Sequence, residues 1–285
     1  MKEIIVTQKY NNKKLNTFLL DCFPNLSPNT LYKALRKKDI RINGKKINEN
    51  IQIFFNDKIT IYISDELLFG NINLEIVYED ENILILNKPA GISVTDNHHN
   101  EESLTSIVKK QFGNSLEPCH RLDRNTTGLI LYAKNSDSLN ILLEKFKNHE
   151  IEKHYKATVL GLLNVKHKTL EAYLFKDSKK SLVYISDNPQ KNYTKIITEY
   201  SVINENIEKN ISELDVILHT GKTHQIRAHL AHIGHPIIGD GKYGINEINK
   251  KFNKNTQMLC SYKLKFNFTT PSGILKYLNK KEIKL

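Results

Sequence analysis

Cysteine is scarce in this sequence, and long hydrophobic stretches are absent. The three cysteines, Cys22, Cys119 and Cys260, lie far apart with no paired spacing. This argues against a disulfide scaffold or a cysteine zinc ribbon and favours a reducing compartment. No apolar run approaches the roughly 20 residues of a membrane-spanning helix. The opening MKEIIVTQKY has too few consecutive apolar residues for a secretory signal. We therefore expect a cytoplasmic protein without membrane contact.

Sequence signatures of bound cofactors are also missing. The glycines at positions 221, 234, 239, 241 and 244 fit neither a P-loop nor a dinucleotide fingerprint. The chain has no HExxH metalloprotease pattern, no internal repeat and no low-complexity tract. We expect neither a small-molecule cofactor nor a metal ion.

The composition is that of a globular protein with an uneven positive charge. The chain has 285 residues, of which 39% are apolar and 26% charged, enough for one large domain or two ordinary ones. Of the formal charge of +11, most lies in residues 1–64, where twelve Lys and Arg face five Asp and Glu. This concentration predicts a polyanionic partner. Lysines that merely solvate the surface are the alternative.

Arginine marks a few positions in a chain that otherwise uses lysine. Only five of the 42 basic residues are arginine: Arg36, Arg41, Arg121, Arg124 and Arg227. Two lie in the basic N-terminal segment, two flank Asp123, and one lies in THQIRAH. Because a guanidinium forms bidentate contacts that lysine cannot replace, we expect these segments to bind carboxylate or phosphate.

Residues 13–63 indicate one compact unit with a basic surface. Ser27-Pro28 is a capping hydroxyl followed by proline at the first helical position, and it predicts a helix start. Asn43-Gly44 predicts a hairpin turn, and KITIYI (58–63) alternates as a strand does. We expect phosphate contacts from the helix and the hairpin, through Lys33, Arg36, Lys37, Arg41 and Lys45.

The order of these elements resembles the small alpha-L RNA-binding domain of the S-four type. The similarity covers about fifty residues through LNTFL, SPNTLYKALRKKDIRINGK and NDKITIYI. It implies an RNA-binding domain over residues 1–64, followed by a polar linker at 65–74.

From Leu74 onward the pattern becomes that of a mixed α+β domain, over residues 75–285. Strands are predicted over 74–80, 82–89, 128–133, 153–161 and 215–221, and helices from Ser136 and over 223–234. Most of the strands should pair antiparallel, so the fold class is α+β with a mainly antiparallel sheet.

Asp123 is the leading candidate for chemistry. In an extended strand Arg121 and Asp123 project from one face, and residues 124–128 then form a turn. A carboxylate held in a dry cleft can act as a nucleophile or as a general base. Alternatively, the carboxylate caps the turn by accepting from the amides of Thr126 or Thr127.

A second candidate is a histidine cluster. His224, His229, His232 and His235 are spaced so that a helix could present several of them to zinc. However, Gly234-His235-Pro236 interrupts the helix. Histidines that pack and hydrogen-bond under a loop are therefore the favoured interpretation, and a metal-dependent hydrolase is the weaker one.

Four ordered segments resemble the RluA family of pseudouridine synthases. They are NKPAGISV (87–94), HRLDRNTTGLILYAKN (120–135), EKHYKATVLG (152–161) and TGKTHQIRAHLAHIGHPIIGDGKYG (220–244). Asp123 stands at the position of the family's nucleophile, and Tyr155 lies in the segment that bears its active-site tyrosine. Asn125, Thr127, Lys222 and Cys260 depart from the usual family residues without removing a catalytic group.

The resemblance implies an enzyme that converts uridine in RNA to pseudouridine without a cofactor. It implies Asp123 as nucleophile, Arg227 as its ion-pair partner, and Tyr155 stacked against the target base and helping to exchange the C5 proton. Arg121 would insert into the RNA or anchor its own strand, Arg124 and Lys222 would contact RNA, and His120 would be structural. Large-subunit ribosomal RNA is the expected partner, with tRNA as the alternative, and we expect a monomer. A noncatalytic RNA-binding or ribosome-assembly factor of the same fold is the competing hypothesis.

Overall fold

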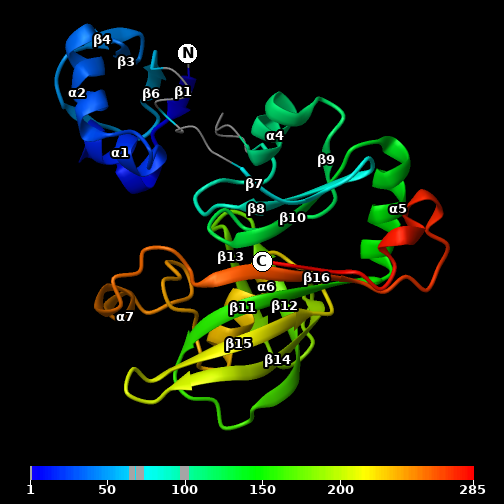
Figure 1. Ribbon diagram of the computed structural model, residues 1–285. Helices are drawn as coiled ribbons and strands as arrows, with labels where there is room; N and C mark the ends of the chain where they lie inside the picture. Colours follow the sequence, from blue (N-terminus) through cyan, green and yellow to red (C-terminus); the bar gives the residue numbers. More distant parts are fainter. Residues whose placement is uncertain (1, 64–67, 69–73, 97–102) are drawn as a thin grey trace. The chain divides into compact units, whose positions relative to one another are not determined.

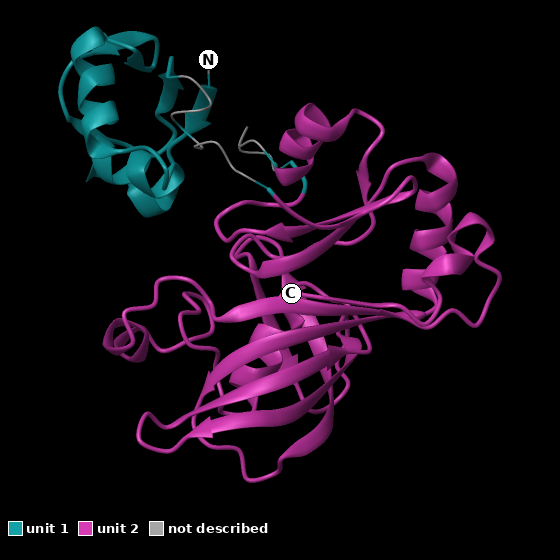
Figure 2. Cartoon of the chain, viewed as in Figure 1, with its two compact units in different colours: residues 1–74, 95–103 teal, residues 75–94, 104–285 magenta. Residues whose placement is uncertain are grey.

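The computed structural model describes residues 2–63, 68, 74–96 and 103–285. The chain divides into two compact units, one of residues 1–74 and 95–103, the other of residues 75–94 and 104–285 (Figure 2). The linker expected at 65–74 lies outside the described residues, apart from residues 68 and 74. Within the described ranges, no helix is long and apolar enough to span a bilayer.

The first unit packs two helices against a small sheet. Helix α2 begins where the sequence predicted, because the Ser27 hydroxyl accepts from the Thr30 amide at 3.1 Å and Pro28 follows. It ends at Lys38, whose φ of 61° is left-handed. Leu31 and Leu35 of α2 are buried in the unit's core. The helices are α1 (Leu15–Cys22) and α2 (Pro28–Lys37), after a 3-10 turn at Gln8–Tyr10.

The sheet of this unit contains the predicted hairpin. Its order is β1-β6-β3-β4, with Asn43 and Gly44 at φ of 51° and 81° between β3 and β4. Both residues tolerate that conformation, so the hairpin prediction is confirmed. A separate pair is formed by β2 and β5. The strands are β1 (Lys2–Ile5), β2 (Lys13–Lys14), β3 (Ile40–Ile42), β4 (Lys45–Ile47), β5 (Gln52–Ile53) and β6 (Lys58–Ile61).

The second unit is built on one large sheet (Figure 1). Its strands run in the order β13-β12-β14-β15-β11-β16-β10-β8-β7, with β9 beside β10 and β17 beside β16. Of the pairs between its described strands, only β10 with β16 is parallel. The predicted α+β class with a mainly antiparallel sheet is therefore confirmed. The strands are β7 (Glu75–Glu79), β8 (Ile83–Lys88), β9 (Glu117–Pro118), β10 (Thr127–Ala133), β11 (Ile151–Leu160), β12 (His167–Asp177), β13 (Leu182–Ser186), β14 (Thr194–Asn206), β15 (Ile211–Leu218), β16 (Leu259–Phe266) and β17 (Glu282–Lys284).

Helices cover parts of this sheet. The predicted start of α5 is confirmed, since the Asn135 side chain accepts from the Ser138 amide at 2.9 Å. Leu142 of α5 is buried in the core, whereas the neighbouring Leu143 is exposed. Ala228 of α6 packs in a second cluster on β12, β13 and β14. The helices are α4 (Leu104–Phe112), α5 (Ser136–Lys147), α6 (Gln225–His232) and α7 (Asn246–Lys251), with a 3-10 helix at Gly273–Leu278.

The close pairing of β10 with β16 requires glycine at position 128. A Cβ atom there would lie 2.2 Å from the carbonyl oxygen of Ser261, and the φ of 104° is itself one that side chains rarely adopt. Strand β11 pairs with the other edge of β16, with an irregularity between His154 and Tyr155. Three neighbouring strands therefore place the turn before β10 close to Tyr155.

Candidate active site

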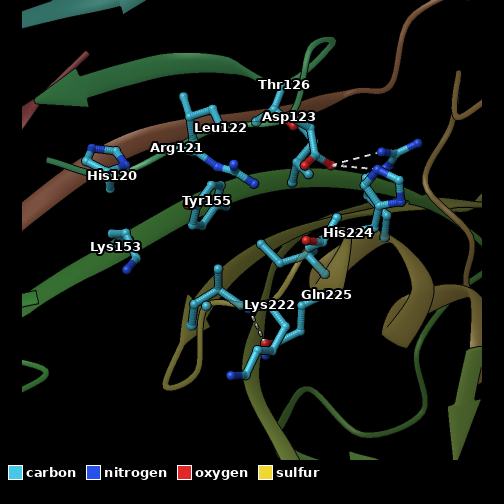
Figure 3. Close-up of a pocket in the computed structure, with 16 residues that line it drawn as sticks. His120, Arg121, Leu122, Asp123, Thr126, Lys153, Tyr155, Lys222, His224 and Gln225 are labelled. Carbon is cyan, nitrogen blue, oxygen red and sulfur yellow. Dashed lines mark hydrogen bonds and ion pairs between the residues drawn. The ribbon is translucent and has the colours of Figure 1, made fainter. Parts of the chain in front are cut away.

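A cavity of about 290 Å³ lies in the second unit where three chain segments meet. They are the stretch before β10, strand β11 and the segment from the end of β15 into α6. Figure 3 shows Asp123 beside His224, with Arg121 and Tyr155 nearby. Its lining includes His120, Arg121, Asp123, Tyr155, Lys222, His224 and Arg227.

Asp123 lies in a tight turn, but not at the end of a strand. The predicted extended strand through Arg121 is wrong, because residues 119–126 lie outside the assigned strands. The cause is His120, whose Nε2 accepts the Leu131 amide at 3.1 Å in place of a main-chain carbonyl and so ends the pairing of β9 with β10. This contact supports the structural role expected for His120. Burial lowers the pKa of His120 to about 3, consistent with a neutral acceptor.

The Asp123 carboxylate does not cap its own turn. The Thr126 amide donates to the main-chain carbonyl of Asp123 at 3.1 Å. The carboxylate instead accepts from Arg227, whose Nη1 lies 2.8 Å from Oδ2. The capping alternative is therefore wrong, and the carboxylate faces the cavity with its side chain 24% exposed.

Arg227 is shared between two carboxylates. Its Nε and Nη2 donate to the two oxygens of Asp240, at 2.7 and 2.9 Å, while Nη1 reaches Asp123. Burial disfavours both charges, but the hydrogen bonds and charge of Asp240 raise the pKa of Arg227, and Arg227 in turn lowers the pKa of Asp240. The Asp240 side chain is completely buried and also accepts from the Lys242 and Tyr243 amides at 2.8 and 3.1 Å. Asp240 thus fixes the guanidinium in the orientation that meets Asp123.

The NKPAGISV segment supports the turn that contains Asp123 through hydrogen bonds to the main chain. Lys88 is fully buried and its Nζ donates to the carbonyls of Pro89, Ile92 and Arg124 at 2.8, 2.9 and 2.9 Å. The Gly91 amide donates to the same Arg124 carbonyl at 3.0 Å. Burial lowers the pKa of Lys88 to about 7, although the charge of Asp123 opposes this shift. This segment therefore positions the residue after Asp123.

Tyr155 forms part of the cavity wall. Its side chain is 5% exposed and belongs to β11. Burial raises the pKa of Tyr155, and the charge of Asp123 raises it further. The hydroxyl therefore keeps its proton at neutral pH, and the ring offers a neutral aromatic surface to the cavity.

The structure separates the remaining predicted site residues into two groups. Arg121 and Lys222 are exposed and line the cavity, whereas Arg124 is half-buried and contacts Lys88 through its carbonyl. The other five lie in the first unit. There Lys33, Arg36 and Lys37 of α2 and Lys45 of β4 are exposed, and Arg41 of β3 lies over the Tyr62 ring at 4.9 Å.

The four histidines of the segment at 220–244 have separate partners. Within the described ranges, no group of three His, Cys, Asp or Glu residues could hold a metal ion. The partners are Tyr243 Oη for His224, Thr198 Oγ1 for His229, Asp187 for His232 and the Leu160 carbonyl for His235.

Sequence reasoning missed the site roles of Lys88, Asp240, Gln225 and His224. Lys88 comes shortly after the apolar run ILIL, and this local pattern indicates that the end of the strand is buried. Gln225 connects α6 to β14, because its Nε2 donates to the Ile197 carbonyl and to Thr198 Oγ1, both at 3.0 Å. Asp240 lies in a glycine-rich stretch that indicates only a turn, and its pairing with Arg227 had no signal in sequence spacing.

Comparisons with known proteins identify a matching family and similar sequences. The family model described as RNA pseudouridylate synthase matches residues 82–232. The chain is 32% identical to the ribosomal large subunit pseudouridine synthase C of Buchnera aphidicola (subspecies Baizongia pistaciae), over 92% of this chain and 88% of the relative. It is also 32% identical to an uncharacterized RNA pseudouridine synthase of Mycoplasma capricolum, over 99% of this chain and 97% of the relative.

A solved structure shares the fold. The human RNA pseudouridylate synthase domain containing 1 matches with a TM-score of 0.60 and 23% identity, over 75% of this chain and 89% of that chain. Fold and family match together define the class, which is an isomerase acting within RNA. The chain belongs to the RNA pseudouridine synthase family, and the resemblance to the RluA type is confirmed.

Proposed function

We propose that this protein converts uridine to pseudouridine in large-subunit ribosomal RNA, with Asp123 as the nucleophile. The observation that carries the proposal is the Asp123 carboxylate, which is held by Arg227 at 2.8 Å and faces a cavity walled by Tyr155. The relatives' names support the choice of RNA, since several are called ribosomal large subunit pseudouridine synthases. A ribosomal substrate would place the protein in the cytoplasm, and we propose that it acts there as a monomer.

The reaction detaches uracil from its sugar, turns it and rejoins it through C5, with loss of the C5 proton. Asp123 attacks either the uracil ring or the sugar carbon, and Arg227 orients its carboxylate. Tyr155 stacks against the uracil. Burial raises the pKa of Tyr155, so its hydroxyl carries a proton when the uracil binds, and its part in exchanging the C5 proton stays a prediction.

The target uridine has to leave its stack before Asp123 can reach it. Arg121 and Lys222, exposed beside the cavity, would contact the RNA that surrounds the extruded base, and Arg124 a neighbouring phosphate. In residues 1–64, the exposed lysines and arginine of α2, with Arg41 and Lys45, would bind phosphates as an alpha-L domain does, with residues 65–74 as the linker.

The decisive experiment compares wild-type protein with Asp123→Asn on a ribosomal RNA transcript. Asparagine keeps the shape of the side chain but is not nucleophilic, so we expect no pseudouridine by mass spectrometry, while RNA affinity stays near that of wild type. Undiminished product from Asp123→Asn would disprove the nucleophilic role.

The RNA-binding part is tested by Lys33→Gln, Arg36→Gln and Lys37→Gln combined. We expect weaker RNA binding and a salt slope shallower by about 0.7 to 0.9 for each phosphate that the variant no longer neutralises. The single-turnover rate at saturating RNA should not change. A collapse of that rate would contradict the proposed division between the two units.

A further inference from the structure

His224 is the residue at the cavity whose role the proposed reaction does not yet explain. It precedes α6 with a φ of 54°, a left-handed conformation that is uncommon outside glycine and costs free energy. This conformation places its imidazole in the cavity wall, with Nε2 4.0 Å from Asp123 Oδ2 (Figure 3).

Tyr243 determines which imidazole nitrogen carries the proton. Its hydroxyl oxygen accepts from the Val183 amide at 2.9 Å and lies 2.9 Å from His224 Nδ1. Because one acceptor position of the hydroxyl oxygen is already used by Val183, we assign the hydroxyl proton to the hydrogen bond with Nδ1, so that the ring proton lies on Nε2, the nitrogen nearer to Asp123. Burial lowers the pKa of His224 to about 4, so the ring is neutral at physiological pH.

The two oxygens of the Asp123 carboxylate have different surroundings. Oδ2 accepts from Arg227 Nη1 at 2.8 Å and is also the oxygen nearest to His224. Oδ1 has no hydrogen bond to any residue within the described ranges. One oxygen is thus held by the protein and the other is available to a substrate.

We propose that His224 is a positioning residue that donates its Nε2 proton in a hydrogen bond to Asp123 Oδ2 when RNA closes the cavity, leaving Oδ1 as the attacking atom. The proposal rests on the nucleophilic role of Asp123. Hydrogen bonds of this kind have lengths of about 2.7 to 3.2 Å, so the gap has to close by about 1 Å, as happens when free enzymes bind substrate. Tyr243 keeps the imidazole from turning away.

The test measures single-turnover tritium release from C5 of uridine-labelled ribosomal RNA at saturating protein, together with RNA affinity. We expect His224→Ala to slow the step by about tenfold to a hundredfold, the worth of a hydrogen bond to a charged group. His224→Gln, whose amide can donate from a similar position, should stay within about threefold of wild type. Tyr243→Phe should fall between them, at about threefold to tenfold slower. RNA affinity should be unchanged in all three.

His232→Ala is the matched control, because His232 is the last residue of α6, the helix that His224 precedes, and it pairs with Asp187 on the surface. It should react at the wild-type rate. The proposal is overturned if His224→Ala reacts like wild type, or if His224→Gln is as slow as the alanine variant. Should His224→Ala unfold, the glutamine and Tyr243→Phe variants decide the question. Product from Asp123→Asn would instead remove the nucleophile on which the proposal rests.

Discussion

The second unit contains two clusters of buried charge that are built differently. In one, Lys145 and Glu150 are 0% and 4% exposed and lie 2.9 Å apart. Glu150 also accepts from the Thr269 and Thr270 amides at 2.9 and 3.2 Å and from the Thr270 hydroxyl at 2.6 Å, while Lys145 donates to the Thr270 carbonyl at 2.7 Å. The other cluster contains Asp123, Arg227 and Asp240.

The two clusters differ in whether every carboxylate oxygen accepts a hydrogen bond from the protein. Both oxygens of Glu150 are hydrogen-bonded within the protein, so that cluster is closed. In the other, Asp240 is equally closed, but Asp123 keeps one oxygen without a partner among the described residues and faces a cavity. Asp123 is only half-buried, so the oxygen without a protein partner can be solvated or meet a substrate, whereas Glu150 is buried with both oxygens bonded. A partly satisfied carboxylate in a cavity is a candidate for chemistry, and a fully satisfied buried one is a structural group.

The largest effect on stability should come from Lys145→Ala. The change leaves the Glu150 carboxylate buried without its cation, which typically costs about 3 to 5 kcal/mol of unfolding free energy. Urea unfolding measures this loss. The folded variant should isomerise uridine at the wild-type rate, since no member of that cluster lines the cavity.

Its control is Lys195→Ala, which breaks the exposed pair with Glu171. Exposed pairs are screened by solvent, and the urea midpoint should therefore not move. Equal losses in the two variants would show that burial does not distinguish these ion pairs.

A smaller and mixed effect is expected from Asp240→Asn. The asparagine amide would point N–H groups at the guanidinium, so the contacts at Arg227 Nε and Nη2 cannot both persist. We expect a loss of about 1.5 to 3 kcal/mol in stability, with a single-turnover rate lower by about tenfold or more. Asp137→Asn, on the exposed first turn of α5, is the control and should leave the rate unchanged. A wild-type rate in Asp240→Asn would show that Arg227 needs no second carboxylate.

The third prediction separates the two regions by pH. Burial lowers the pKa of His224 and His229 from 6.5 to about 4 and that of His120 to about 3, so the unfolded chain binds protons first and stability should fall as the pH drops from about 6.5 to 3. For Glu150, burial is outweighed by hydrogen bonds from Thr270 and Lys145, which lower its pKa from 4.5 to about 2. The contribution of Glu150 to the free energy of unfolding is present above pH 4.5 and should be lost between about pH 4.5 and 2.

Denaturant unfolding at a series of pH values checks both windows. Glu150→Gln should flatten the dependence below about pH 4.5 and leave the higher window as in wild type. A changed slope between about pH 5 and 6.5 in this variant would contradict the assignment of that window to the histidines.

The helix starts and the hairpin could be predicted because each is specified by residues that are neighbours in the sequence. Ser27-Pro28, Asn43-Gly44 and the apolar periodicity after Ser136 each specify a structure within a few residues. The path of the chain at Asp123 could not be predicted in this way, because it depends on the hydrogen bond between the His120 imidazole and the Leu131 amide.

The same limit applies to the site. Motif resemblance pointed to Asp123, Tyr155 and Arg227, and the cavity brings these three together. The partners that fix them are set by tertiary contacts: Lys88 with the Arg124 carbonyl, and Asp240 with Arg227. Such contacts join residues far apart in sequence, where neither periodicity nor turn chemistry carries information.

The parallel pairing of β10 with β16 has a consequence for how the protein matures. Gly128 lies against Ser261, so the strand that follows the Asp123 turn pairs with β8 and β9 first and acquires its third neighbour only after β16 has been synthesised. A nascent chain that ends before β16 therefore lacks Leu259, which lines the cavity, and the strand that lies between β10 and β11. The segment that contains Asp123 and the strand that contains Tyr155 are joined in one sheet only when this late strand is in place.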